Sequence, residues 1–172
     1  RVVCIEGFGL ARTTPAQAPA RYREWLAQLR VPPAFARFPS LEAFAQLLAR
    51  RNPRLPAERA AFIAAAWSEL HADGSVTMRA DPAHKRFNAV LYRREEAEAV
   101  WREVNAPVLY VVAEQSDFLP RLGDDGRPEN MARLIPRLEP CLVTDAGHMV
   151  HHEQPERLAR AIEDFLDRHA CA

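Results

Sequence analysis

Two polar loops hold the residues that are best suited to catalysis in this sequence. Glu114-Gln115-Ser116-Asp117-Phe118 follows the apolar run Val108 to Ala113, and Thr144-Asp145-Ala146-Gly147-His148-Met149 follows the apolar run Cys141 to Val143. Ligands of open parallel sheets bind beyond the carboxyl ends of the strands. A carboxylate from the first loop and His148 from the second are therefore expected to meet, with the acid holding the imidazole in one tautomer.

Asp117 is predicted to be this acid, so that Asp117 and His148 form the predicted catalytic pair. Glu114, in the same loop, and Glu6, after the first apolar run of the chain, are alternatives that stay open. The small pair Ala146-Gly147 predicts a sharp turn that projects His148 into the site. The plain alternative for His148 is a structural histidine at a loop tip.

The elements that must position these residues follow from hydrophobic periodicity. Continuous apolar runs at Val2 to Ile5, Val108 to Ala113 and Cys141 to Val143 predict buried strands of a parallel sheet, the first closed by a turn at residues 6–9. Helices are predicted around Ala97 to Val104, around Met131 to Leu138 and from Pro155 onward. The charged run at residues 93–96 is interpreted as a solvated helix start. Alternating strands and helices predict an α/β fold.

The segment between the first strand and this α/β part has a helical pattern. Apolar spacing predicts three helices: one from Tyr22 to Leu29, a second that begins after an N-cap at Ser40, and a third from Ile63 through Leu70. A turn and then a short extended piece at residues 75–78 are predicted to follow. Several aromatic residues are interpreted as helix packing, with one or two of them lining an apolar substrate pocket: Trp25, Phe44, Phe62, Trp67 and Trp101.

The order of these features resembles the C-terminal part of the α/β-hydrolase fold. The resemblance rests on Ala106-Pro107 before an apolar strand, an acid after it, Ala146-Gly147-His148, and the residues 152–156 (His-Glu-Gln-Pro-Glu) that open the last helix. It implies parallel strands corresponding to strands 6, 7 and 8, with a helical cap inserted after strand 6. Residues 1–10 would be the core strand, 11–90 the cap and 91–172 the C-terminal core.

The sequence departs from the family pattern in the acid loop. The family often has glycine at the position of Ala113, and its acid usually comes where this sequence has Ser116. Asp117 thus inherits the acid role with an offset of one position. Some family members place the acid after strand 6, which here would be Glu6.

A nucleophile elbow, Gly-x-nucleophile-x-Gly, is missing from the sequence. No serine, cysteine or aspartate is flanked by glycines two positions away on both sides, the serines being Ser40, Ser68, Ser75 and Ser116. The resemblance places the elbow and part of the oxyanion hole upstream of strand 6. The sequence is therefore expected to begin in the middle of a fold, and the fragment alone is expected to be inactive.

The resemblance implies a hydrolase that forms a covalent intermediate, with carboxylic esters as the default substrates and His148 as general base. An Asp nucleophile would instead imply an epoxide hydrolase or a haloalkane dehalogenase-like enzyme. The alternative from another class is a truncated, non-catalytic binding module. No cofactor is implied, and the spacing of His148, His151, His152 and Glu153 does not match a metal site.

Composition restricts the partners and the compartment. Lys plus Arg number 23 and Asp plus Glu number 23, with no basic block, which argues against nucleic acid and anionic membrane surfaces and favours a small, largely apolar substrate. No stretch is apolar enough to span a bilayer, and no signal-peptide pattern opens the sequence. Cys4, Cys141 and Cys171 lack metal or redox spacing, which predicts a cytoplasmic protein. The sequence does not predict the oligomeric state.

Overall fold

In the computed structural model, which describes residues 1–7 and 9–170, the chain forms two compact units. Residues 1–13 and 92–172 make up the first unit, and residues 14–91 make up the second. Phe8, in the turn predicted after the first strand, and Cys171 lie outside the described residues. The chain thus leaves the first unit after residue 13 and returns to it at residue 92.

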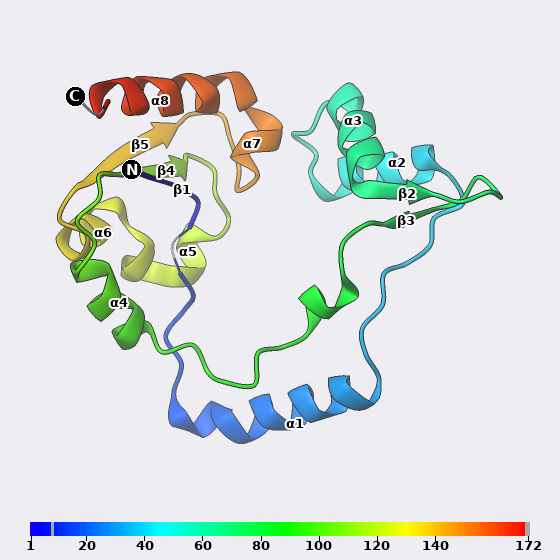
Figure 1. The fold of residues 1–172 in the computed structure, drawn as a ribbon, viewed down its shortest axis with the longest axis horizontal. Helices are drawn as coiled ribbons and strands as arrows, with labels where there is room; N and C mark the ends of the chain where they lie inside the picture. The colour runs from blue at the N-terminus through cyan, green and yellow to red at the C-terminus, as the bar shows by residue number, and fades with distance from the viewer. Residues whose placement is uncertain (8, 171–172) are drawn as a thin grey trace. The chain divides into compact units, whose positions relative to one another are not determined.

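A three-stranded parallel sheet forms the centre of the first unit (Figure 1). Its order is β1 (Val2–Ile5), β4 (Val108–Ala113) and β5 (Leu138–Val143). The predicted α/β class and the parallel arrangement of the three strands are confirmed. β5 begins at Leu138 instead of Cys141. The apolar run understates its length because β5 is an edge strand of this sheet, where a residue such as Pro140 is tolerated.

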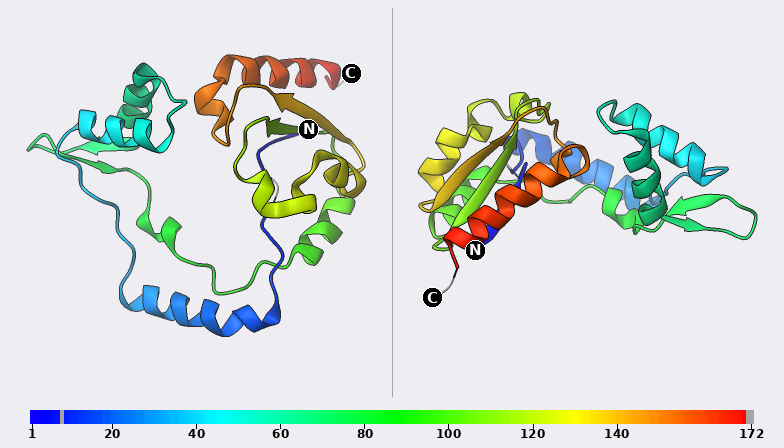
Figure 2. Two further views of the ribbon diagram at one scale, coloured as in Figure 1. Left: turned by 180° about the vertical axis from the view of Figure 1, so that it is seen from behind. Right: turned by 90° about the horizontal axis from the view of Figure 1, so that it is seen from above.

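β4 is buried on both faces because helices cover both sides of the sheet (Figure 2). One face packs against α7 (Val150–Glu153) and α8 (Pro155–Arg168), through Leu109, Val111 and Ala113. The other face packs against α4 (Arg94–Arg102), α5 (Leu119–Leu122) and α6 (Pro128–Leu134), through Val108, Tyr110 and Val112. This burial on two sides explains why the run is apolar without alternation.

The predicted helix from Met131 to Leu138 is wrong in its position. α6 starts at Pro128, the favoured first helical position for proline, and ends at Leu134. Ile135 has extended backbone angles (φ −113°, ψ 108°), and the chain then enters β5. Leu138 packs with the same core cluster as a helical residue would, but it does so from the strand. Apolar periodicity alone could not distinguish a helix from a strand at these residues.

The prediction that the charged run at residues 93–96 is solvated is wrong for Arg94, whose side chain is fully buried. Its guanidinium donates to Oε1 of Glu98 (3.0 Å) and to the carbonyl oxygens of Leu10 (3.2 Å) and Asp125 (2.7 Å). These acceptors compensate for the loss of hydration. Arg94 therefore ties the segment that leaves the first unit to the helix that begins where the chain returns.

The second unit contains α1 (Ala18–Arg30), α2 (Leu41–Arg51) and α3 (Ala57–Trp67), together with the short 3-10 turns Pro15–Gln17 and Pro82–Lys85. The predicted N-cap is confirmed, since Oγ of Ser40 accepts a hydrogen bond from the backbone of Ala43 (3.2 Å). Phe44, Ala64 and Val76 form a buried cluster in this unit. Of the described helices in the two units, none is both long and apolar enough to cross a bilayer.

The predicted continuation of α3 through Leu70 is wrong, because a hairpin follows the helix. β2 (Ser68–Leu70) pairs antiparallel with β3 (Val76–Met78). Oγ of Ser68 donates to the carbonyl of Ala64 (2.7 Å) at the end of the helix, and Gly74 adopts the left-handed conformation that the turn needs (φ +82°). Leu70 is consequently exposed, as is Phe62, which was predicted to pack.

Candidate active site

Glu6 lies immediately after β1, at the carboxyl end of the parallel sheet. Its backbone N–H donates to the carbonyl of Val111 (2.9 Å) and so continues the ladder between β1 and β4. Glu6 then adopts a left-handed conformation (φ +53°), which is uncommon for a residue other than glycine. Backbone strain of this kind is concentrated at functional sites. The turn allows the Glu6 side chain to lie buried at the end of the sheet.

The buried carboxylate of Glu6 lies against three polar groups. Oε1 accepts from the backbone N–H of Ala113 (2.6 Å), at the end of β4. Oε2 accepts from Oγ of Ser116 (2.5 Å) and faces Nδ1 of His148 (3.1 Å). These donors replace the water that a carboxylate would otherwise need, and they hold the group in one orientation.

His148 lies after β5 and is held by Glu6 on one side and by an aromatic ring on another. Its ring stacks on Phe118, with 4.0 Å between the ring centroids and 25° between the planes. The side chain is 31% exposed, whereas the Glu6 side chain is 2% exposed. Because Nδ1 pairs with the Glu6 carboxylate, Nε2 is the ring nitrogen that is available for proton transfer.

The loop that carries His148 is anchored to the loop after β4. Oε2 of Glu114 accepts a hydrogen bond from the backbone of Asp145 (2.9 Å), and the backbone of Gln115 donates to the carbonyl of Ala146 (2.9 Å). Ala146 is fully buried in the core. Among the described residues of this loop, the left-handed conformation (φ +54°) belongs to Asp145 and not to Gly147. The turn predicted from Ala146-Gly147 is thus made one residue earlier.

A second anchor comes from α7, which follows the loop. Oε2 of Glu153, a buried residue, accepts a hydrogen bond from the backbone N–H of Gly147 (2.7 Å), the residue before His148. Nε2 of the next residue, Gln154, donates to the carbonyl of Asp145 (3.0 Å). The His148 backbone is therefore held from both sides, which is what a catalytic group needs for a fixed geometry.

The predicted hydrogen bond between Asp117 and His148 is wrong, since His148 pairs with Glu6, one of the two open alternatives. The Asp117 carboxylate is 66% exposed and accepts from Nη2 of Arg121 (2.9 Å). The Arg121 guanidinium also lies over the Phe118 ring, 4.7 Å from its centroid. Glu114, the other alternative, binds the His148 loop and not the imidazole.

The reason for this difference lies in the sizes of two side chains. Ser116 stands where the family usually has its acid, and a hydroxyl there fills less space than a carboxylate and donates to one. The longer Glu6 side chain reaches from β1 past the end of β4, at Ala113, to the loop after β5. An acid directly after the first apolar run was the signal for Glu6 in the sequence. Only the spatial order β1-β4-β5 shows how far it must reach.

The two histidines after His148 lie in α7 with their ring centroids 4.1 Å apart. Partial loss of solvent lowers the pKa of His151, and a nearby His148 charge lowers it further. The pKa of His152 is lowered by partial loss of solvent and by His151, with Glu153 acting in the opposite direction. Both rings therefore favour the neutral form.

The arrangement can accept and return a proton. Nδ1–H directed at a buried carboxylate leaves Nε2 basic, and the carboxylate stabilises the imidazolium once it forms. The two described cysteines do not provide an activated nucleophile, because burial raises the pKa of both the Cys4 and the Cys141 thiols. The pair could thus activate the hydroxyl of another group or a water molecule.

Comparison with known proteins finds a matching family and several similar folds. The sequence model of the alpha/beta hydrolase family matches residues 2–161. No curated protein matches the sequence.

Three solved structures illustrate the likeness. E-2-(acetamidomethylene)succinate hydrolase is 25% identical, with a TM-score of 0.64 over 96% of this chain and 57% of that one. A hypothetical protein from Pseudomonas aeruginosa PAO1 is 21% identical (TM-score 0.77, 96% and 58%). An esterase from Mycobacterium tuberculosis is 18% identical (TM-score 0.65, 97% and 52%). The chain spans little more than half the length of these structures.

Proposed function

The chain belongs to the alpha/beta hydrolase family, and we propose that the protein containing it hydrolyses carboxylic esters of small, largely apolar molecules. In this proposal His148 and Glu6 are two members of a nucleophile-His-acid triad. The observation that carries it is the contact between Nδ1 of His148 and a buried carboxylate at the carboxyl ends of parallel strands. Hydrolysis as the reaction class is supported by the similar structure that is itself a hydrolase.

The proposed mechanism uses the imidazole twice. A nucleophilic hydroxyl attacks the ester carbonyl while Nε2 of His148 takes its proton, and the imidazolium is stabilised by Glu6. Nε2 then protonates the leaving alcohol as the carbon-oxygen bond breaks, which leaves an acyl-enzyme. Water, activated by the same nitrogen, releases the acid and restores the hydroxyl.

We propose that the nucleophile comes from sequence outside residues 1–172. Within these residues no serine, cysteine or aspartate stands between glycines in the elbow pattern. The partial coverage of the similar structures is consistent with a longer protein. The 172-residue chain alone is therefore expected to show no esterase turnover above buffer, because base and acid without a nucleophile and oxyanion hole lose most transition-state stabilisation.

The same His148–Glu6 pair would serve an Asp nucleophile, as in epoxide and haloalkane hydrolysis, by activating the water that cleaves the ester intermediate. It would serve no reaction in a truncated binding module. Nothing in the described residues favours either alternative over ester hydrolysis. Both are therefore outcomes that the test must separate.

The test is p-nitrophenyl butyrate hydrolysis by the full-length protein, its His148→Ala variant and the 172-residue chain. We expect turnover by the full-length protein, a loss of about a thousandfold or more in His148→Ala, and none by the chain. An acyl-enzyme detected by mass spectrometry on a serine supports the proposal. Heavy oxygen from labelled water incorporated into an aspartate indicates the epoxide or haloalkane class, and turnover that survives His148→Ala overturns the role of His148.

A cytoplasmic location is also proposed. Cys4 and Cys141 are free thiols in the structure, and neither has a partner at disulfide spacing among the described residues. Free thiols of this kind are typical of reducing compartments.

A further inference from the structure

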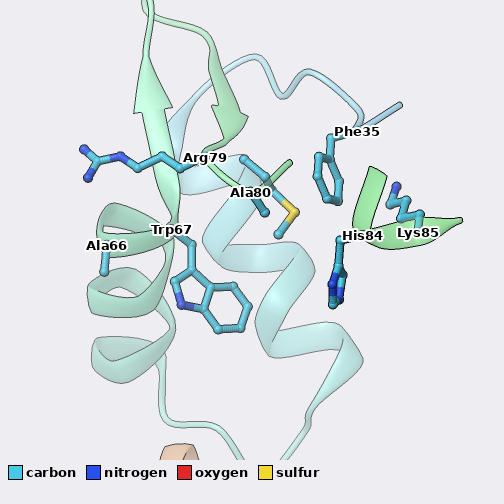
Figure 3. Close-up of a pocket in the computed structure, with 8 residues that line it drawn as sticks. Phe35, Ala66, Trp67, Arg79, Ala80, His84 and Lys85 are labelled. Carbon is cyan, nitrogen blue, oxygen red and sulfur yellow. The ribbon is translucent and has the colours of Figure 1, made fainter. Parts of the chain in front are cut away.

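The second unit contains a pocket of about 490 Å³. This size lies within the range of roughly 300–1,000 Å³ that is usual for small-molecule sites. The pocket is formed where the end of α3, the residues after β3 and the 3-10 turn Pro82–Lys85 come together (Figure 3). It lies wholly within residues 14–91 and contains no residue of the Glu6–His148 site.

The interior of the pocket is apolar and partly aromatic. The Trp67 indole lies on one side, and the Phe35 and His84 rings lie on the other, as Figure 3 shows. Met78 and Ala80 also line it. Flat aromatic walls favour a flat apolar group between them, because offset stacking adds to the free energy gained by burying the surface. The shape and lining therefore indicate an aromatic ligand body.

The edge of the pocket is positively charged. Nζ of Lys85 lies over the Phe35 ring, 4.2 Å from its centroid, and donates one hydrogen bond to the carbonyl of Ala34 (3.0 Å). An ammonium group has three donors, so this single bond leaves capacity for a ligand. A second cation, Arg79, also lines the pocket, but its guanidinium extends away from Phe35 and Lys85 in Figure 3, and the described lining residues include no aspartate or glutamate. The charge therefore complements an anion beside the aromatic body.

We propose that this pocket binds a monocarboxylate with an aromatic body, which packs between Trp67 and Phe35 while its carboxylate pairs with Lys85. The ion pair selects the anion, since the corresponding neutral amide accepts a hydrogen bond from the same ammonium but has no negative charge to pair with it. The aromatic walls select the body. The site is independent of the proposed hydrolysis, because binding requires neither His148 nor a nucleophile.

The test compares hydrocinnamate with hydrocinnamamide, its neutral isostere, by isothermal titration calorimetry on the full-length protein. We expect hydrocinnamate to bind at least about tenfold more tightly, and Lys85→Gln to abolish this difference. Ala80→Leu, which fills the pocket, should weaken binding of both compounds by about tenfold or more. Arg86→Gln removes an exposed cation next to Lys85 that does not line the pocket, and it should leave both affinities unchanged.

Each remaining outcome is decisive. Equal affinity of the two compounds, no binding of either, or binding that survives Ala80→Leu overturns the proposal, provided that circular dichroism shows each variant to be folded. His148→Ala should bind hydrocinnamate as the unchanged protein does, so failure of ester hydrolysis and failure of this site can be distinguished. If hydrocinnamate quenches the tryptophan fluorescence and this quenching is lost in Trp67→Phe, the ligand binds beside the Trp67 indole.

Discussion

Nδ1 of His148 lies 3.1 Å from Oε2 of Glu6, although the two residues are 142 positions apart in the chain. Glu6 follows β1 and His148 follows β5, and β4 lies between the two strands. The contact therefore spans the width of the sheet. It depends on the order of the strands and on the reach of the glutamate side chain.

The first prediction separates the two candidate acids. In the full-length protein, Glu6→Gln should lower kcat/KM for an ester by about a hundredfold to ten-thousandfold, because the imidazolium loses its charged partner. Asp117→Asn, the matched control, removes an exposed ion pair and should change kcat/KM by less than about fivefold. Steady-state kinetics checks both. If Asp117→Asn lowered kcat/KM more than Glu6→Gln did, the catalytic acid would be Asp117.

The second prediction concerns a variant that carries the acid at position 116, in the loop after β4, instead of at position 6. Ser116 Oγ and His148 Nδ1 both contact Oε2 of Glu6, so a carboxylate at position 116 would lie near the imidazole. We expect Ser116→Asp to restore at least about tenfold of the activity that is lost in Glu6→Gln. Combining Glu6→Gln with Ser116→Asn provides the uncharged control. Equal activity of the two double variants would mean that the position cannot host the acid.

The third prediction concerns the anchor of the His148 loop. Glu153→Ala leaves the N–H of Gly147 without its acceptor in a buried position, which should lower the free energy of unfolding by about 1–3 kcal/mol. Glu163→Ala, an exposed position on α8, should stay within about 0.5 kcal/mol. Urea denaturation followed by circular dichroism measures both. A Glu153→Ala protein as stable as Glu163→Ala would show that the hydrogen bond contributes little.

The fourth prediction is a pH dependence of stability from His151 and His152. Their folded-state pKa values lie below the ordinary value of 6.5, so the unfolded chain binds more protons once the pH falls below about 6.5. The free energy of unfolding should therefore decrease as the pH is lowered through this range and level off below the folded-state pKa values. In the His151→Gln/His152→Gln double variant the decrease should be smaller. If the free energy of unfolding of the double variant decreased between pH 7 and pH 5 as steeply as that of the unsubstituted protein, the prediction would be contradicted.

The fifth prediction compares two neighbouring arginines. Arg94→Ala removes a fully buried guanidinium from its ion pair with the partly exposed Glu98 and should destabilise the protein by about 3–5 kcal/mol. Arg93, whose side chain is 68% exposed, pairs only at 3.7 Å with Glu96. Arg93→Ala should cost less than about 1 kcal/mol. Thermal and urea unfolding of the two variants would reveal the difference, and similar stabilities would mean that the burial of Arg94 contributes little.

Several elements could be predicted from the sequence because their patterns have a single physical explanation. The run Val108 to Ala113 forms β4 with the predicted bounds, since six consecutive apolar residues after a proline are typical of a short strand covered on both faces. β1 and the start of α8 at Pro155 were also predicted, as was the position of His148 after a parallel strand. The family resemblance rested on motifs that flank these elements, such as Ala146-Gly147-His148, and the comparison with the family confirmed it.

Only the tertiary structure decided which acid faces His148 and which charges are buried. Glu6, Glu114 and Asp117 all follow apolar strands, and nothing local to any of them measures a distance to an imidazole after another strand. Likewise, Arg93 and Arg94 are neighbouring residues of the same type. Arg93 is exposed, yet Arg94 is enclosed by carbonyl and carboxylate oxygens from three segments. Periodicity reports which face of an element is apolar, because that is a property of neighbouring residues. Partner choice between distant polar groups depends on strand order and side-chain reach, which exist only once the chain has folded.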